Sequence, residues 1–271
     1  MFDEIRKIPY FAARNFRMLY TYKLAFSASI IGIVFNLFYL VLFGSMFGIS
    51  NLQSISNYGG DFISYLLIGS IGWSFLWSIM DATSVSLSQE MSLGPFESIL
   101  LTPTRLSTLM LSYSLYGCFF GFIILVVLMV VGFFLFGISV FASATILTLI
   151  IFVLSVSMMI GFGMIFGGLT IWLKQIGETV TLLQNVALFF CGVYFPIAVL
   201  PELFQPIAQY VPFYYSIEGL RISLIPSTPA SEIYYFIGVL LILSIIFVLT
   251  GLVVLRTGLA KAKRDGSLAF Y

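Results

Sequence analysis

Residues 109–136 read LMLSYSLYGCFFGFIILVVLMVVGFFLF, a stretch without a single Asp, Glu, Lys or Arg. A helix needs about 20 apolar residues to cross the hydrocarbon core of a bilayer, and this stretch exceeds that length. The rest of the chain has the same character, with 61% hydrophobic and 8% charged residues among 271. A water-soluble domain of this size needs far more charge on its surface. The sequence therefore predicts an all-α integral membrane protein.

Five other apolar segments flank this stretch, and each is long enough to be a candidate span. We expect six transmembrane helices, at residues 24–47, 62–86, 109–136, 144–169, 179–195 and 233–255. The fifth is the shortest. No internal repeat or long connection divides the chain, so residues 1–271 are predicted to form one domain. We expect the N-terminal residues to be retained, since no small-residue cleavage site follows the first apolar run.

The basic residues give these spans a direction. Eleven of the twelve Lys and Arg residues fall in the N-terminal segment, the second and fourth connections and the C-terminal tail, whereas Arg221 falls on the opposite side. Lys and Arg are enriched on the cytosolic side of membrane proteins. We therefore predict a multi-pass protein of the cell (plasma) membrane with both termini in the cytosol.

Residues 3–22 are predicted to form an amphipathic helix at the membrane surface. At about 100° per residue, its apolar and basic side chains fall on opposing arcs. The apolar arc holds Ile5, Ile8, Ala12, Phe16, Leu19 and Tyr20, and the basic arc holds Arg6, Lys7, Arg14 and Arg17. Such a helix lies in the headgroup layer, with its cations near anionic lipid. A plain positively charged anchor is the alternative.

The second cytosolic connection, residues 88–107, reads SQEMSLGPFESILLTPTRLS. Gly94-Pro95 breaks the preceding helix and starts a new one, and Thr102-Pro103 ends it. Phe96, Ile99 and Leu100 form one apolar face on this helix, which is too short to be stable alone. It either docks on a partner or folds back onto the membrane helices, and the residues leave both interpretations open.

A second unusual stretch, residues 191–224, contains four prolines and many aromatic residues. The prolines exclude one continuous helix, but the stretch is too apolar for a free loop, so we expect short helices over 196–223 at the outer surface. Glu218 and Arg221 are one helical turn apart and are predicted to pair. An unpaired charge at that depth costs about 2.5–3.5 kcal/mol. A substrate site is the alternative.

These two segments carry a resemblance to a known family. The run from Glu90 through 94–101 to Thr102-Pro103 resembles the Glu-x-Gly-Thr-x-Glu-x-Leu-Leu-x-Thr-Pro stretch of ABC-2 type permeases, the membrane subunits of ABC exporters. Pro95 stands where that family usually has threonine. The Phe-Pro…Leu-Pro…Pro…Glu-x-x-Arg pattern over 195–221 is similar to the segment that follows their fifth span. The resemblance extends to the six spans and covers essentially the whole chain.

The resemblance implies a role for each segment. Residues 94–103 would be the coupling helix, inserted into a groove of a separate ATP-binding subunit. The implied coupling residues are Glu90, Gly94, Phe96, Glu97, Ile99, Leu100, Thr102, Pro103 and Arg105. Residues 196–223 would be re-entrant extracellular helices that close an outer gate, with Phe195, Pro196, Pro201, Pro212, Glu218 and Arg221 as gate residues. Two permease subunits, identical or different, would meet along spans two and five and work with two ATP-binding subunits that hold Mg-ATP.

The residue inventory argues against catalysis or a cofactor in this chain. It has no His, and Cys118 and Cys191 are isolated in apolar runs, which argues against a zinc, haem or Cys-His site. No Gly-x4-Gly-Lys-[Ser/Thr] phosphate loop is present, so we expect no ATP hydrolysis here, and no feature indicates nucleic acid. Asp81 and Glu178 fall near cytosolic span ends and Asp61 near an outer end. The lack of a charge at a span midpoint argues against an ion-coupled carrier.

Polar side chains in spans two and five are candidates for the solute path. They are Ser70, Trp73, Ser74, Trp77 and Ser78, together with Thr181, Gln184 and Asn185. Helix packing is the alternative, and it is favoured for the glycine pairs Gly117–Gly121 and Gly163–Gly167. We therefore predict a non-catalytic permease subunit that moves a hydrophobic or amphipathic, drug-like or lipid-like solute out of the cytosol. A polysaccharide or haem exporter is the alternative within the class, and an ATP-independent carrier is the alternative outside it.

Overall fold

The computed structural model describes residues 2–21, 23–46, 62–93, 95–102, 104–138, 144–173, 176–225 and 228–264, and it contains no strand in these ranges. Its elements are α1 (Phe2–Thr21), α2 (Lys23–Met46), α4 (Phe62–Leu93), α5 (Pro95–Leu100), α6 (Leu106–Phe136), α7 (Ile146–Leu173), α8 (Gly177–Phe190), the 3-10 helix η2 (Ile197–Val199), α9 (Gln205–Tyr210), α10 (Pro212–Ser223) and α11 (Ala230–Arg264).

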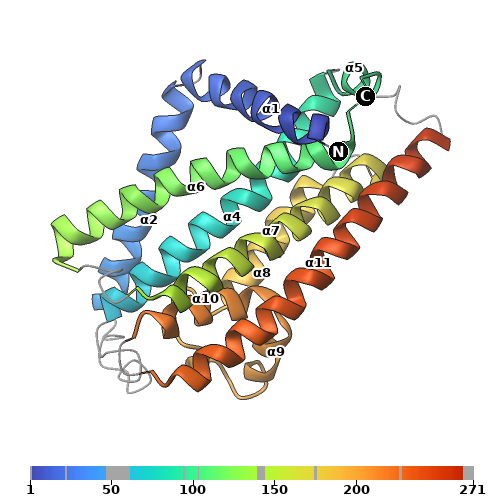
Figure 1. Cartoon of the computed structure of the whole chain (residues 1–271). Helices are drawn as coiled ribbons and strands as arrows, with labels where there is room; N and C mark the ends of the chain where they lie inside the picture. The colour runs from blue at the N-terminus through green and yellow to red at the C-terminus, as the bar shows by residue number, and fades with distance from the viewer. Residues whose placement is uncertain are drawn as a thin grey trace.

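Four long helices, α4, α6, α7 and α11, form the body of the molecule (Figure 1). Helix α4 lies between α6 and α7, and α11 packs on the outer side of α7. The order of the contacting residues shows that α6 runs antiparallel to α4, whereas α4, α7 and α11 are parallel. Each of the four is long and apolar enough to cross a membrane. The predicted all-α membrane class is therefore confirmed.

Helices lie at all six predicted span positions, but only four of them meet the criteria of length and hydropathy for a span. Helix α2 has a shorter apolar part at Phe26–Leu42, and α8 has 14 residues. At 1.5 Å per residue α8 is about 21 Å long, less than the roughly 30 Å of a hydrocarbon core. Helices α4 and α11 instead continue to Leu93 and Arg264, beyond the predicted span ends at 86 and 255.

Glycines allow α7 and α11 to approach each other backbone to backbone. A Cβ atom added to Gly161 would lie 2.5 Å from the carbonyl carbon of Phe247, and one added to Gly168 would lie 2.7 Å from the carbonyl oxygen of Val254. Reciprocally, Cβ atoms on Gly251 and Gly258 would lie 2.5 and 2.4 Å from the carbonyl oxygens of Gly161 and Gly168. The two parallel helices thus meet through glycines seven residues apart on each, the close packing that small residues permit in membranes.

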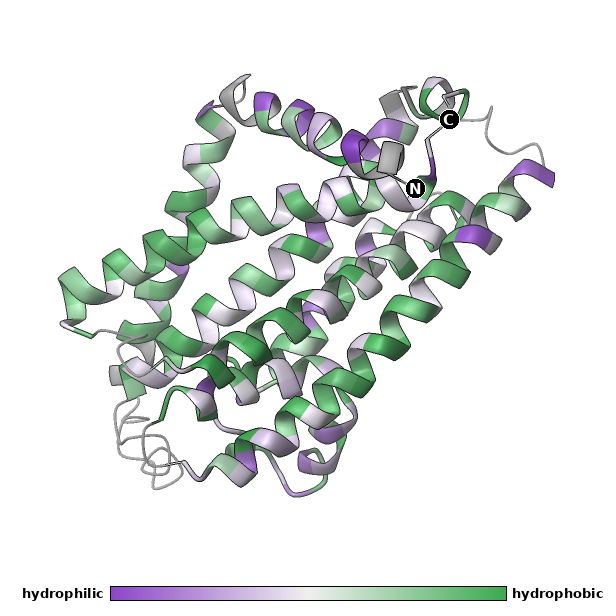
Figure 2. Ribbon diagram, viewed as in Figure 1, coloured by the Kyte–Doolittle hydropathy of each residue, from purple (hydrophilic) through white to green (hydrophobic). Residues whose placement is uncertain are grey.

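The two ends of the bundle differ in character. Helices α1 and α5 and the last turn of α11, with Lys261, Lys263 and Arg264, gather at one end, which we call the basic end (Figure 2). Helices α9 and α10 and the 3-10 helix lie at the other, which we call the cap end. Between them the outer surfaces of α2, α6 and α11 expose large apolar side chains, for example Phe35, Phe134 and Leu249. An apolar band of this kind is suited to lipid.

Candidate functional site

Helix α5 is a short helix at the basic end, within residues 94–103, where the sequence predicts a short helix. It begins at Pro95, and it ends where the Thr102 backbone N–H and hydroxyl both donate to the Ile99 carbonyl, at 3.0 and 2.6 Å. Phe96 is 3% exposed and packs with Leu87, Met91 and Tyr113, while Ile99 and Leu100 cover the same cluster. The apolar face of α5 therefore folds back onto the bundle.

This packing describes the short helix within a single chain, and contact of the expected coupling residues with a partner stays a prediction. Phe96 was expected to contact a partner, and within this chain its side chain is buried in an apolar cluster to which α4, α6, α7 and α11 contribute. What α5 turns outward is its far side and its end, where Leu101 is 89% exposed and Ser98, Thr102 and Arg105 are also exposed. Gly94 and Pro103 lie outside the described residues, as does the side chain of Glu97.

Glu90, another expected coupling residue, is also directed inward. Its carboxylate accepts a hydrogen bond from and forms an ion pair with Arg14 of α1, which lies 76 positions away in the sequence. The apolar side of α1 covers α6, where Phe16 meets Tyr116 and Phe119 with ring centroids 5.8 and 4.6 Å apart. The amphipathic helix is therefore attached to the bundle by both of its faces, and Arg14 belongs to an intramolecular contact.

At the cap end, Arg221 is the centre of a buried polar cluster, which we call the Arg221 clamp: Tyr65, Gly192, Glu218 and Arg221. Arg221 is 0% exposed. Its guanidinium donates to the Glu218 carboxylate at 2.8 Å and to the Gly192 carbonyl at 3.0 Å. The guanidinium carbon also lies 3.7 Å from the Tyr65 ring centroid, and the Tyr65 hydroxyl donates to the Gly192 carbonyl at 2.8 Å. The predicted Glu218–Arg221 pair is confirmed.

Two glycines make the Arg221 clamp possible. Gly192 has a φ of +64°, a left-handed conformation that glycine adopts readily. It lies in the turn after α8, and the Gly192 carbonyl accepts a hydrogen bond from Arg221. Gly69 of α4 leaves room for the clamp, because a Cβ atom there would lie 2.2 Å from the Val193 carbonyl oxygen and 2.7 Å from Arg221 Nη2. The clamp thus joins three segments, α4, the turn after α8, and α10.

The other expected gate residues lie in the segment that runs from the end of α8 to the first residue of α10. The short helices predicted over 196–223 are present, with Pro206 in the first turn of α9 and Pro212 as the first residue of α10. Phe195 is partly buried and its ring meets Phe189 of α8 at 5.5 Å, Pro196 is buried, and Pro201 is exposed. Helix α10 itself is buried over Ser216–Ser223.

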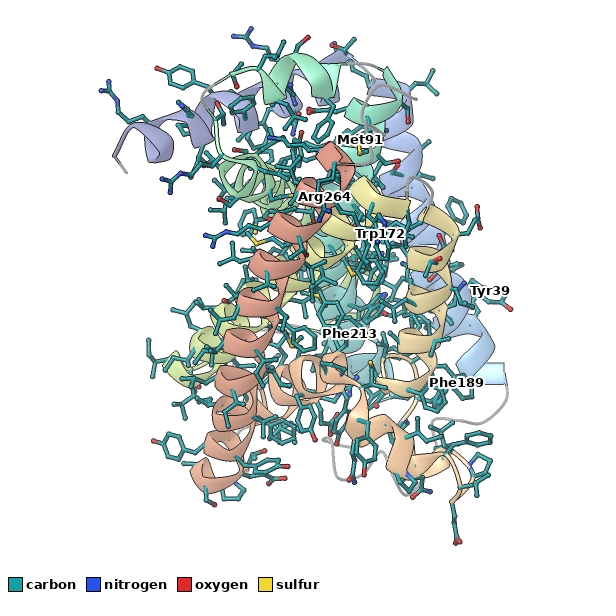
Figure 3. The ribbon with its side chains drawn as sticks, turned by 90° about the vertical axis from the view of Figure 1, so that its right-hand side faces the viewer. Tyr39, Met91, Trp172, Phe189, Phe213 and Arg264 are labelled. Atoms are coloured by element: carbon teal, nitrogen blue, oxygen red, sulfur yellow. The ribbon has the colours of Figure 1, made fainter. Side chains whose placement is uncertain are left out.

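The candidate path residues of α4 divide between two faces. The hydroxyl of Ser78 donates to the Phe75 and Gly117 carbonyls at 2.6 and 2.9 Å, so Ser78 serves the α4–α6 contact, as helix packing predicts. The rings of Trp73 and Trp77 stack with centroids 5.2 Å apart, and both meet edge-on the ring of Phe213 of α10. Phe213 is labelled in Figure 3. Ser70, three residues before Trp73, is also buried. Neither the Ser70 hydroxyl nor the Trp73 indole N–H has a hydrogen-bond partner in the described structure.

The candidate path residues of α8 are not buried. Thr181 and Asn185 are exposed and Gln184 is partly buried, and within α8 only Val180 and Ala187 are buried. The eight candidate residues therefore do not form one lining within a single chain. Helix α4 lies inside the bundle, with 78% of its most apolar part buried. The small residues of α4 pack against α6, α7 and α10 within this chain, and contact between two subunits along span two stays a prediction.

Of the expected glycine contacts, Gly117 and Gly121 do pack against the α4 backbone, while Gly163 and Gly167 meet side chains, those of Thr83 and Met110. The glycine contacts between α7 and α11 were missed. Their signal in the sequence is the matching seven-residue spacing of Gly161–Gly168 and Gly251–Gly258.

The fold defines a multi-pass helical membrane protein with the short helix α5 packed at its basic end and the short helices α9 and α10, each with a proline in its first turn, at its cap end. The family model of the ABC-2 type transporter matches residues 11–225. The chain therefore belongs to the ABC-2 type transporter family, whose members are membrane transport subunits that usually work with an ATP-binding subunit. No curated protein matches the chain.

Proposed function

We propose that this chain is the permease subunit of an ATP-driven exporter of hydrophobic or amphipathic solutes. A separate ATP-binding subunit, two copies per transporter, would bind Mg-ATP and dock at the basic end, which would face the cytosol. The observation that carries this proposal is α5, a short helix held on the bundle by Phe96 that presents Leu101 to the outside. An 89% exposed leucine beside a cytosolic helix fits a groove on a partner protein.

Helix α4 would carry the motion from one end of the bundle to the other. It is one continuous helix of 32 residues, about 48 Å long. Its last turns hold Glu90, which pairs with Arg14, and lead into α5, and its first turns hold Tyr65 of the Arg221 clamp and Gly69, which leaves room for the clamp. A shift of α5 caused by ATP-driven closure of the partner would therefore move α10 through a rigid connection, which supports a role for the cap end as the outer gate.

A second permease subunit would complete the path. Most side chains of α8 are exposed, including Leu182, Val186 and Phe189, whereas α4 is enclosed. We propose that the second subunit covers α8, and that solute passes between the subunits to the outside of the cell membrane or into its outer leaflet.

The docking proposal can be tested by ATP turnover of the purified permease with its ATP-binding subunit in lipid nanodiscs. Leu101→Asp places a charge on the exposed end of α5 and should lower solute-stimulated turnover about tenfold or more, because it removes an apolar anchor from the interface. Leu203→Asp is the matched control, since Leu203 is 78% exposed at the cap end. Its turnover should stay near that of the wild type. Equal turnover in Leu101→Asp and wild type would refute docking through α5.

A further inference from the structure

Asp81 is a carboxylate in the membrane-spanning part of α4 that the export proposal leaves without a task. It is exposed, and no hydrogen bond or ion pair is found for it in the part of the chain that the structure describes. The distance along α4 from Phe62 to Asp81 is about 28 Å at 1.5 Å per residue. This places Asp81 close to the basic-end edge of a hydrocarbon core of roughly 30 Å. Ionisable residues at such positions are costly and point to a function.

Aromatic rings from three other helices gather at the same level. Gly117 of α6 packs against Ser78 and Ala82, so its neighbour Tyr116 lies level with Asp81 along α4. The Tyr116 ring is 5.8 Å from that of Phe16 and 6.5 Å from that of Phe120, centroid to centroid. Phe120 in turn lies 5.9 Å from Phe26 of α2. We call these four rings, Phe16, Phe26, Tyr116 and Phe120, the aromatic group.

A carboxylate beside aromatic rings has a defined chemical preference. The faces of aromatic rings attract cations, and the attraction strengthens where water is excluded. The carboxylate adds a full opposite charge, which favours a cation, is neutral toward an uncharged solute and repels an anion. The rings also provide apolar surface for the hydrophobic part of such a solute.

We infer that Asp81 and the aromatic group form a loading site for an amphipathic organic cation at the basic-end edge of the membrane. This inference rests on the proposed export of amphipathic solutes and specifies their charge. The site lies where α1, α2 and α6 meet α4, so a cation held at the membrane surface with its apolar part in the lipid reaches it from the side. The aromatic group would bind the apolar part while Asp81 neutralises the charge.

Two ions of the same size and shape test the charge preference directly. Binding of tetraphenylphosphonium, a cation, and tetraphenylborate, an anion, is measured by equilibrium dialysis against the full chain in phosphatidylcholine nanodiscs, with empty nanodiscs subtracted. Asp81→Asn preserves the shape of the side chain and should weaken binding of the cation about tenfold or more. Asp81→Glu should restore binding to within about threefold of wild type, because it restores the charge.

A matched control separates the site from general surface charge. Glu178→Gln removes the same formal charge from an exposed position in the first turn of α8 and should leave cation binding unchanged. For the aromatic group, Tyr116→Leu should weaken cation binding about two- to fivefold, whereas Tyr116→Phe, which keeps the ring, should not. Circular dichroism of each variant verifies that it is folded.

Three results would overturn the inference: equal binding of the cation by wild type and Asp81→Asn, the same loss in Glu178→Gln, or an equal loss for the anion. None of these results bears on ATP coupling, because the dialysis uses the permease alone. Conversely, a complex whose ATP turnover responds to no solute would refute the proposed function, while selective cation binding through Asp81 would still stand.

Discussion

Replacing Arg221 by methionine should destabilise the protein severely. Arg221 is fully buried, and the variant removes its hydrogen bonds to the Glu218 carboxylate and the Gly192 carbonyl and its contact with the Tyr65 ring. Glu218, itself 5% exposed, then keeps a buried charge without its guanidinium partner. Removing one member of a buried ion pair costs about 3–5 kcal/mol, and we expect a loss of that size in the free energy of unfolding.

Two companion variants identify the origin of the loss. Glu218→Gln combined with Arg221→Met removes the stranded charge, so the double variant should lose only about 2 kcal/mol, which reflects the missing hydrogen bonds of about 1 kcal/mol each. Arg221→Lys keeps a cation but cannot donate in two directions as a planar guanidinium does, and it should lose about 1–2 kcal/mol.

The measurement is an unfolding titration of the full chain with sodium dodecyl sulfate in mixed micelles, followed by circular dichroism. The reasoning fails if Arg221→Met loses less than about 1 kcal/mol, since a buried charge would then have been left at no cost. It also fails if the double variant loses as much as Arg221→Met, because removal of the stranded charge would then have had no effect.

Two further comparisons follow from the packing, and both are read from thermal unfolding of the chain in detergent. Gly161→Ala should lower stability by about 1–3 kcal/mol, because its Cβ would lie 2.5 Å from the α11 backbone. Gly238→Ala, whose added Cβ would have nothing within 4 Å, should be neutral or up to about 1 kcal/mol stabilising. Equal shifts in the two variants would argue against backbone contact between α7 and α11. Phe96→Ala should lower the free energy of unfolding by about 3–5 kcal/mol, because it leaves a cavity under α5. Leu101→Ala should change it by no more than about 0.5 kcal/mol. A large loss in Leu101→Ala would mean that Leu101 also supports the fold.

The sequence predicted the helices well where hydrophobicity alone decides and less well at their ends. Long apolar runs place α4, α6, α7 and α11 correctly, because an apolar segment in lipid must satisfy its own backbone by forming a helix. The polar residues after Ser86 continue α4 because serine and glutamate are compatible with a helix outside the membrane. Helix α8 ends at Phe190 instead of residue 195, since Gly192 adopts a left-handed conformation two residues later. Such a turn has no hydrophobic signal.

The sequence predicts which residues of the candidate sites act together, but not which surface each of them contacts. Periodicity shows that Phe96, Ile99 and Leu100 share one face, but not whether a partner or the same chain covers it. The pairing of Glu218 with Arg221 could be predicted because it is local, one turn along a helix. The pairing of Glu90 with Arg14 could not, because the two are distant in sequence and meet only through the packing of α1 on the bundle.

The family match ends at residue 225, and α11 begins at Ala230, beyond it. Of the glycines at the contact between α7 and α11, Gly161 and Gly168 lie inside the matched region, and Gly251 and Gly258 lie outside it. The boundary of the family is therefore not a boundary of folding. A chain cut after residue 225 would open a groove of bare backbone along α7, and a chimera that takes its last helix from a relative must carry glycines at the positions of Gly251 and Gly258 if the two parts are to fit.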